Sequence, residues 1–318
     1  MKEKCFVGVD CHKNTIACYV EGKFKEFSTT KKGFEQALKW APKDCNWAIE
    51  GAYHFGLTFA AYLISKGCKV YEFNALSTSK ARKIYSVSGE KSDYMDAKVI
   101  SKVASDPEIR LQEVSLATIE LKRKISKRDL YVKQRTGVIN NVKAGFVQEG
   151  INPLYKDFTT KRAIQWLLKQ EDSEKRYAGK ILETLNEIIS QLEKEIEELT
   201  PEKAKRLTKI KGISTLRACI IYASTRGKKM SKAQFASYSG VAPVRNESGL
   251  KQGHRNNHRG DRRLNSVIYS VSRCQSKYDP IGSNYYLKKL QEGKTKRHAR
   301  KCLSRMLCNQ IWKILFMG

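Results

Sequence analysis

Short apolar runs alternate with helical patterns over the first third of the chain. The runs at residues 5–9, 15–27, 46–50 and 68–73 have the length of strands, and Gly22 divides the second run into a hairpin. Apolar residues at helical spacing predict helices over 33–41, 57–66 and 91–104. The order β-β-β-α-β-α-β-α predicts an α/β layer architecture of about 105 residues.

Long polar helices are predicted for the middle of the chain, over residues 115–150 and 174–199. In the second helix apolar residues recur at alternating steps of three and four, as in a heptad repeat: Leu182, Leu185, Ile189, Leu192, Ile196 and Leu199. We expect this seam either to pack on the first helix as an antiparallel hairpin or to form a contact between subunits.

The segment after Pro201 is strongly basic and mostly helical by pattern. Helices are predicted over 203–210, 215–225, 231–239, 262–276 and 298–316, with a glycine-rich polar loop over 240–260. The chain carries a net charge of +29, and residues 201–318 hold 27 Lys and Arg against 5 Asp and Glu. Such an excess favours a polyanionic partner. We therefore expect an α/β domain over 1–110, a helical linker over 111–200 and a basic domain over 201–318.

Composition argues against a membrane or secreted protein. No apolar run reaches the roughly 18 residues of a membrane-spanning helix, and charge interrupts the first apolar residues. The nine cysteines are odd in number and form no CxxC pair, so we expect reduced, mostly buried thiols in the cytoplasm.

Four acidic residues suggest a metal site. Asp10 and Glu50 stand where predicted strands end, and side chains at strand ends project into the crevice beyond the sheet. Asp93 and Asp96 are three apart on a predicted helix and share one face. Each acid alone is more often a surface group or a helix cap. Together their repulsion calls for divalent cations, and oxygen ligands suit Mg²⁺ or Mn²⁺. Such ions can assist cleavage of a phosphodiester.

Cations are dense around the glycine-rich loop, as phosphate binding requires. The candidate phosphate ligands are Arg245, Lys251, Arg255, Arg259, Arg262 and Arg263. Ser239 and Ser248 each precede a glycine, and a serine among arginines could attack phosphorus. A Ser-Gly pair alone is usually a simple turn.

Three segments of the N-terminal part resemble one family. GVDCHKNTI (8–16), AIEGAYHFG (48–56) and KSDYMDAKVIS (91–101) resemble the RuvC-like catalytic domain of the IS110 (IS-one-ten) family of insertion-sequence transposases, which includes Piv-type DNA invertases. The family's four acids fall on Asp10, Glu50, Asp93 and Asp96. Where the family usually has Thr-Gly after the glutamate, this chain has Gly-Ala.

The C-terminal part, from Leu207 to about Leu315, resembles the second domain of the same family. The family's G-x-x-P followed by Ser-Gly falls on Gly240, Pro243 and Ser248. The resemblance therefore places the nucleophilic serine on Ser248, with Ser239 as the fallback.

The resemblance implies an RNase H-like N-terminal domain, a hairpin or coiled-coil linker and a mainly helical basic domain. It implies a recombinase whose acids hold Mg²⁺ or Mn²⁺ and whose Ser248 forms a covalent phosphoserine link to DNA. Implied partners are donor and target DNA, a structured non-coding guide RNA, and further copies of the chain as a dimer or tetramer, at the nucleoid in the bacterial cytoplasm. Two alternatives remain open: an RNase H-like or Holliday-junction nuclease that uses the acids alone, and a non-enzymatic nucleic-acid-binding protein.

Overall fold

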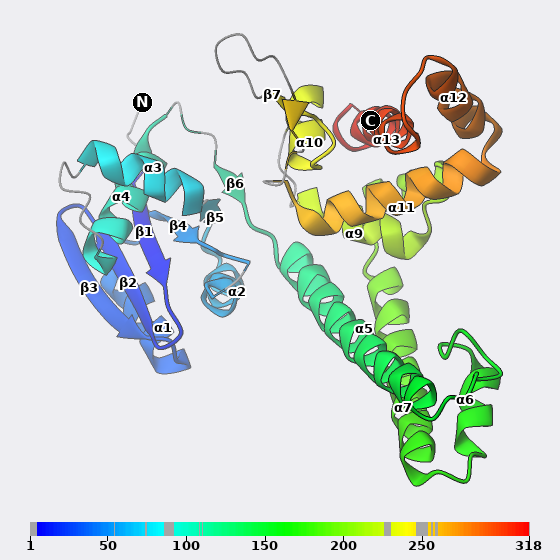
Figure 1. Cartoon of the computed structure of the whole chain (residues 1–318). Helices are drawn as coiled ribbons and strands as arrows, with labels where there is room; N and C mark the ends of the chain where they lie inside the picture. The colour runs from blue at the N-terminus through cyan, green and yellow to red at the C-terminus, as the bar shows by residue number, and fades with distance from the viewer. Residues whose placement is uncertain are drawn as a thin grey trace. The chain divides into compact units, whose positions relative to one another are not determined.

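The computed structural model describes residues 5–317 apart from 54, 74, 86–91, 108, 110, 226–229, 246–253, 256, 258 and 259; for 75–77, 79, 80, 245, 254 and 255 it describes the backbone alone. Contacts divide the chain into two compact units, and most of their helices and strands are labelled in Figure 1. The first runs to Glu120 and the second from Leu121 onward, apart from a few residues directly after Ser224 that group with the first.

A six-stranded mixed sheet in the order β3-β2-β1-β4-β5-β6 forms the centre of the first unit (Figure 1). Its strands are β1 (Phe6–Cys11), β2 (Thr15–Val20), β3 (Lys23–Ser28), β4 (Asn46–Glu50), β5 (Val70–Phe73) and β6 (Gln112–Glu113). The first three strands pair antiparallel, β4 is parallel to β1 and to β5, and β6 is antiparallel to β5. The five predicted strands and the α/β class are confirmed; the two-residue β6 was not predicted.

Different helices cover the two faces of this sheet. The helices α1 (Lys31–Trp40) and α2 (Leu57–Ser65) pack on one face, in a core that includes Val9 and Ile49. On the other face α4 (Asp93–Ser105) packs through Ile100 and Ala104 against Phe6. The helix α3 (Ala75–Tyr85) lies beside α4 and was not predicted.

Two long helices, α5 (Leu116–Gln148) and α7 (Ser173–Glu198), run antiparallel; α7 and all of α5 from Leu121 onward belong to the second unit. Polar pairs between them fix this direction: Lys124 with Glu195, Arg128 with Glu193 and Arg135 with Asn186. A short helix, α6 (Lys161–Leu168), packs against α7. The antiparallel hairpin, one of the two alternatives for the apolar seam, is the arrangement found; α6 was not predicted.

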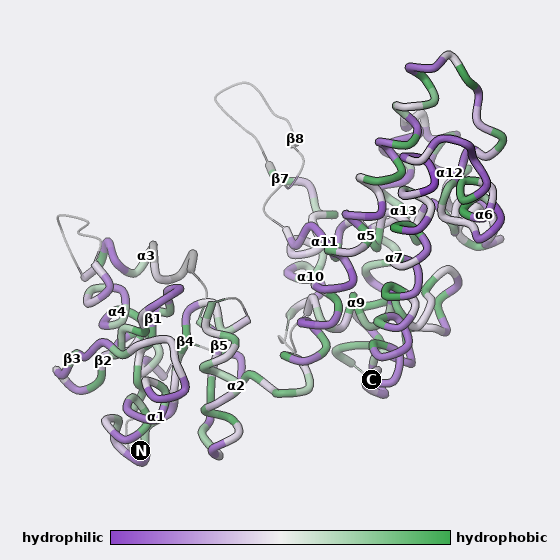
Figure 2. The backbone as a smooth tube through the Cα atoms, turned by 90° about the horizontal axis from the view of Figure 1, so that it is seen from below, coloured by the Kyte–Doolittle hydropathy of each residue, from purple (hydrophilic) through white to green (hydrophobic). Residues whose placement is uncertain are grey.

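The basic part of the second unit is a helical bundle. Its elements are α8 (Glu202–Lys205), the 3₁₀ helix η1 (Arg206–Lys209), α9 (Thr215–Thr225), α10 (Lys232–Tyr238), β7 (Val244–Arg245), β8 (His254–Arg255), α11 (Arg262–Tyr278), α12 (Pro280–Gln291) and α13 (Lys296–Phe316). Hydrophilic and hydrophobic residues alternate along α11 and α13 in Figure 2, as expected of helices that bury one side. The helix predicted over 203–210 divides into α8 and η1, and α12 was not predicted.

Among the helices that the structure describes, none combines the length and the apolar composition of a membrane span. The prediction that the cysteines are reduced is wrong for one pair, since Cys5 and Cys45 form a disulfide with their Cα atoms 4.7 Å apart. The two residues are forty apart in the sequence, and only the pairing of the chain at the start of β1 and β4 brings them together. The other cysteines are free thiols.

Candidate metal centre and nucleic-acid interface

Asp10 and Glu50 occupy equivalent positions on neighbouring parallel strands. The paired residues of β1 and β4 end with Val9 and Ile49, and the two acids come directly after them. Because side chains alternate along a strand, both acids point to the face opposite Val9 and Ile49, which is the face that α4 covers. Glu50 is the last residue of β4, as expected, whereas β1 runs one residue beyond Asp10.

Gly8 allows α4 to lie directly against β1. A Cβ on Gly8 would be 2.2 Å from the carbonyl oxygen of Ala97 and 2.3 Å from the backbone nitrogen of Ser101. The Ser101 hydroxyl also donates a hydrogen bond to the carbonyl of Phe6, at 2.8 Å. Since Asp10 follows Gly8 by two residues on the same face of the strand, this close packing sets the distance from Asp10 to α4.

The first turn of α4 carries the other two acids. Ser92 caps the helix by accepting a hydrogen bond from the backbone N–H of Met95, and Asp93 and Asp96 follow in the first turn. Carboxylates in this turn also interact favourably with the helix dipole. Asp96 is buried, whereas the side chain of Asp93 is about half exposed. The helix start therefore presents one buried and one accessible carboxylate to the edge of the sheet.

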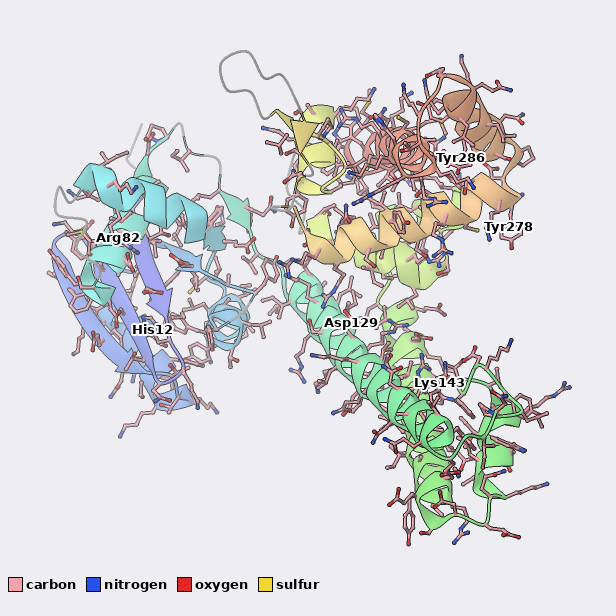
Figure 3. All side chains as sticks on the ribbon, viewed as in Figure 1. His12, Arg82, Asp129, Lys143, Tyr278 and Tyr286 are labelled. Atoms are coloured by element: carbon pink, nitrogen blue, oxygen red, sulfur yellow. A yellow bond between two sulfur atoms is a disulfide. The ribbon has the colours of Figure 1, made fainter. Side chains whose placement is uncertain are left out.

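His12 joins Asp10 and Asp93. Its Nε2 lies 3.2 Å from Oδ2 of Asp10 and 3.1 Å from Oδ1 of Asp93. One ligand atom from each of the three residues lies within 4.8 Å of the other two, which is close enough to surround one metal ion. His12 was not among the predicted ligands of this cluster, because its contact with Asp93 joins the loop after β1 to a helix far along the chain. Figure 3 labels His12.

The helix α3 contributes two further contacts to the acids. Thr78 Oγ1 donates a hydrogen bond to Oε2 of Glu50. Arg82, labelled in Figure 3, reaches Oδ1 of Asp96 with its Nε at 2.7 Å and its Nη2 at 2.5 Å. Neither residue was predicted from the sequence, because no helix was expected here. Their spacing of four residues is the signal that would place them on one helical face.

Burial and mutual repulsion raise the pKa of two of the acids. Burial is the main cause for Asp10; His12 partly offsets it, and the carboxylates of α4 add to it. Burial also raises the pKa of Glu50, against the hydrogen bond from Thr78, and the charges of other cluster carboxylates raise it further. The charges of Asp93 and Asp96 thus act on Asp10, and the charges of Asp10 and Asp96 act on Glu50. A hard divalent cation, which prefers oxygen ligands, would offset the burial and repulsion of the Asp10 and Glu50 carboxylates.

The predicted nucleophile, Ser248, lies outside the described residues. The fallback, Ser239, directly follows α10 and is fully buried, and its Oγ donates a hydrogen bond to the carbonyl of Phe235 at 2.7 Å. In this arrangement the Ser239 hydroxyl is closed to solvent and already has a partner.

The six candidate phosphate ligands are described to different extents. Lys251 and Arg259 lie outside the described residues. The backbones of Arg245 and Arg255 belong to the antiparallel strands β7 and β8. Nothing is described of the side chains of these two arginines.

The two remaining arginines begin α11 and have different surroundings. Arg262 is exposed to solvent. Arg263 forms an ion pair through its Nε with Oδ2 of Asp129 on α5, at 2.8 Å (Figure 3 labels Asp129). Of the two, Arg262 is the one that is open to a phosphate in this structure.

Two family models match the chain. A DEDD transposase model of IS110 matches residues 7–151, and a model described as a transposase of the IS116/IS110/IS902 family matches residues 204–287. The first match contains all four acids of the cluster, and the second contains both candidate serines. The mixed α/β unit is consistent with an RNase H-like fold for a DEDD domain. A search of curated proteins finds no match. Because the two matches cover both terminal parts of the chain, the protein belongs to the IS110 family of transposases, which act on DNA.

Proposed function

We propose that this transposase cuts and rejoins DNA at a composite site, with Asp10, Glu50, Asp93 and Asp96 as metal ligands and Ser248 as the nucleophile. The observation that carries the proposal is the crowding of four carboxylates at the carboxyl ends of β1 and β4 and the start of α4. Burial and repulsion there raise the pKa of Asp10 and Glu50. Such a cluster is unfavourable for the fold unless it serves to hold cations.

Mg²⁺ or Mn²⁺ fits the donor set, which consists of carboxylate oxygens, with the His12 nitrogen beside two of them. When bound, the cation stabilises negative charge that develops at a phosphodiester. The fold of the chain sets the positions of the four ligand residues. The parallel strands β1 and β4 position Asp10 and Glu50, and the capped start of α4 positions Asp93 and Asp96. An RNase H-like fold of this unit accounts for that arrangement.

Ser248 is the better of the two candidate nucleophiles because Ser239 is buried and already hydrogen-bonded. In the reaction the serine Oγ forms a bond to phosphorus as the bond from phosphorus to a deoxyribose oxygen breaks. The serine proton goes to solvent, and the departing deoxyribose oxygen takes up a proton from solvent and becomes a hydroxyl. Attack by a sugar hydroxyl on the phosphoserine reverses the step and rejoins DNA without an external energy source.

We assign a separate role to each of three segments. Residues 1–110 bind the metal, residues 111–200 connect the two terminal domains, and residues 201–318 bind nucleic acid. The excess of positive charge in the last segment supports binding to phosphate backbones rather than to particular bases. A structured guide RNA would then choose donor and target DNA by base pairing. We further propose that the protein works as a dimer or tetramer at the nucleoid of a bacterial cytoplasm.

A hydrolytic RNase H-like or Holliday-junction nuclease is the second candidate. It is favoured by one observation: the acids gather within the first unit, with ligands and supporting contacts all supplied by that unit. Such an enzyme would cleave DNA with the acids alone and would leave no protein on the product.

A denaturing gel separates the two candidates. The protein is incubated with Mg²⁺, DNA of the element ends and RNA from the flanking locus, and a protein–DNA band that survives denaturation is sought. The proposal predicts such a band for wild type and for Ser239→Ala, provided that the latter folds, and its loss in Ser248→Ala and Asp10→Asn. Nicked DNA without the band in wild type would instead support the hydrolytic nuclease. DNA processing that survives Asp10→Asn would mean that the acids are not catalytic.

A further inference from the structure

Arg82 already neutralises one of the acids. Two of its nitrogens contact Oδ1 of Asp96, at 2.5 and 2.7 Å, and both side chains are largely buried, with exposed fractions of 17% for Arg82 and 8% for Asp96. Hydrogen bonds between two charged groups are roughly twice as strong as neutral ones, and burial shields this pair from solvent. The guanidinium therefore holds a carboxylate that the proposed metal centre also needs.

The position of α3 makes this contact part of a larger arrangement. Thr78 and Arg82 are one helical turn apart, so they share a face of α3. That face donates to Glu50 from β4 through Thr78 and to Asp96 from α4 through Arg82. The charge of Arg82 also reaches Glu50, whose pKa it lowers in part. One face of α3 thus supplies hydrogen-bond donors and a positive charge to the carboxylates of Glu50 and Asp96. A bound divalent cation would supply positive charge and coordination to the same carboxylates.

The Arg82 guanidinium and a divalent cation are both positively charged, so they repel each other when both contact the Asp96 carboxylate. At a separation of a few ångströms this repulsion is much stronger inside a protein than it is in water. If Arg82 stays on Asp96, it weakens cation binding; if the cation is bound, the Arg82 contact is weakened by the same amount, because such coupling is reciprocal.

We propose that Arg82 is an internal counter-cation, which holds Asp96 while no metal is bound and competes with the divalent cation for that carboxylate. The inference rests on the proposed function, since it takes the four acids to be the metal centre. Arg82 is then a positioning residue that keeps the crowded carboxylates stable before the cation arrives. Its release from Asp96 accompanies metal binding.

The test is Mn²⁺ binding to the purified full chain without nucleic acid, measured from the electron paramagnetic resonance signal of free Mn²⁺. Arg82→Gln removes the competing charge, and we expect it to bind Mn²⁺ roughly tenfold or more tightly than wild type. Lys83→Gln is the matched control, because it removes the same charge from an exposed neighbouring position of α3. It should bind as wild type does.

The outcomes distinguish a failure of this inference from a failure of the proposed metal centre. Wild type that binds Mn²⁺ while Arg82→Gln binds equally or less tightly would overturn the inference and leave the metal centre intact, because Arg82 would then only orient Asp96. No binding by wild type or by either variant would remove the metal centre and the inference with it.

Wild-type protein offers a second measurement that does not depend on the folding of a variant. The Nε–H of Arg82, assigned by nuclear magnetic resonance, should be protected from hydrogen exchange in chelator. It should exchange faster at saturating Mg²⁺. Unchanged protection with Mg²⁺ bound would contradict the competition.

Discussion

A Cβ on Gly8 would lie 2.2 Å from the carbonyl oxygen of Ala97, so β1 and α4 touch with no room for a side chain between them. Every other residue type would therefore force the helix away from the strand or distort it. The helix carries two of the four acids in its first turn, and the strand carries a third. The geometry of the proposed metal centre thus depends on a glycine that has no functional group of its own.

Gly8→Ala should weaken both the fold and metal binding. Overpacking of this kind usually costs about 1–3 kcal/mol of unfolding free energy, and a shift of α4 also separates its acids from Asp10. Urea unfolding and Mn²⁺ titration measure the two effects. Gly137→Ala is the matched control, since a Cβ there meets nothing within 4 Å, and alanine in a helix should leave stability unchanged or raise it by up to about 1 kcal/mol. Wild-type metal affinity in Gly8→Ala would contradict this role of the packing.

Asp10→Asn should stabilise the metal-free protein at pH 8. Burial raises the pKa of Asp10 in the folded state, so the folded protein favours the protonated, neutral carboxyl. Above that raised pKa the charge opposes folding, and the penalty disappears as the pH falls through it. Urea unfolding in chelator should thus favour the asparagine variant at pH 8, by a margin that shrinks toward pH 4. A wild-type protein that is the more stable of the two at pH 8 would show that the charged Asp10 stabilises the fold.

Divalent cations should raise the thermal stability of the wild type. A ligand that binds only the folded state adds about 2.7 kcal/mol at a concentration one hundred times its dissociation constant. The increase in melting temperature with Mg²⁺ should be lost in Glu50→Gln. It should persist in Glu35→Gln, which removes an exposed acid of α1. An equal increase in both variants would mean that the cation binds elsewhere.

Arg262 and Arg263 should contribute unequally to nucleic-acid binding. Arg262 is exposed, whereas Arg263 is held by Asp129. A phosphate contact of Arg262 predicts that Arg262→Ala makes the salt dependence of DNA affinity shallower by about 0.9 in a log–log plot. Arg263→Ala should have a smaller effect. Fluorescence anisotropy over a range of salt concentrations provides the slopes, and a larger change for Arg263→Ala would refute this assignment.

Local patterns predicted most of the first unit. The strands β1 to β5 and the helix α4 follow from apolar spacing, and the common face of Asp93 and Asp96 follows from the helical period alone. The α3 helix escaped prediction because its inward face is partly polar: Thr78 and Ala81 are buried, and Arg82 pairs with Asp96. Apolar periodicity does not reveal a helix whose buried side chains include polar groups that bind carboxylates.

The α12 helix was missed for a related reason. Its first turns contain Gly282, which by sequence suggests a loop. A Cβ there would lie 2.8 Å from Cβ of Gln275 on α11, so the glycine serves the close packing of two helices. Contacts of this kind, like those of His12 with the acids, join positions that no local pattern connects.

The most direct test of the composite site is to identify the residue that carries DNA. After the covalent complex is trapped, the DNA is digested with nuclease and the protein with trypsin, and the modified peptide is found by mass spectrometry. Trypsin separates the candidates, because Ser248 falls in NESGLK (246–251) and Ser239 in AQFASYSGVAPVR (233–245). We predict a nucleotide adduct on NESGLK that requires Mg²⁺ and Asp10. An adduct on the other peptide, or cleaved DNA with no adduct on any peptide, would contradict the proposed role of Ser248.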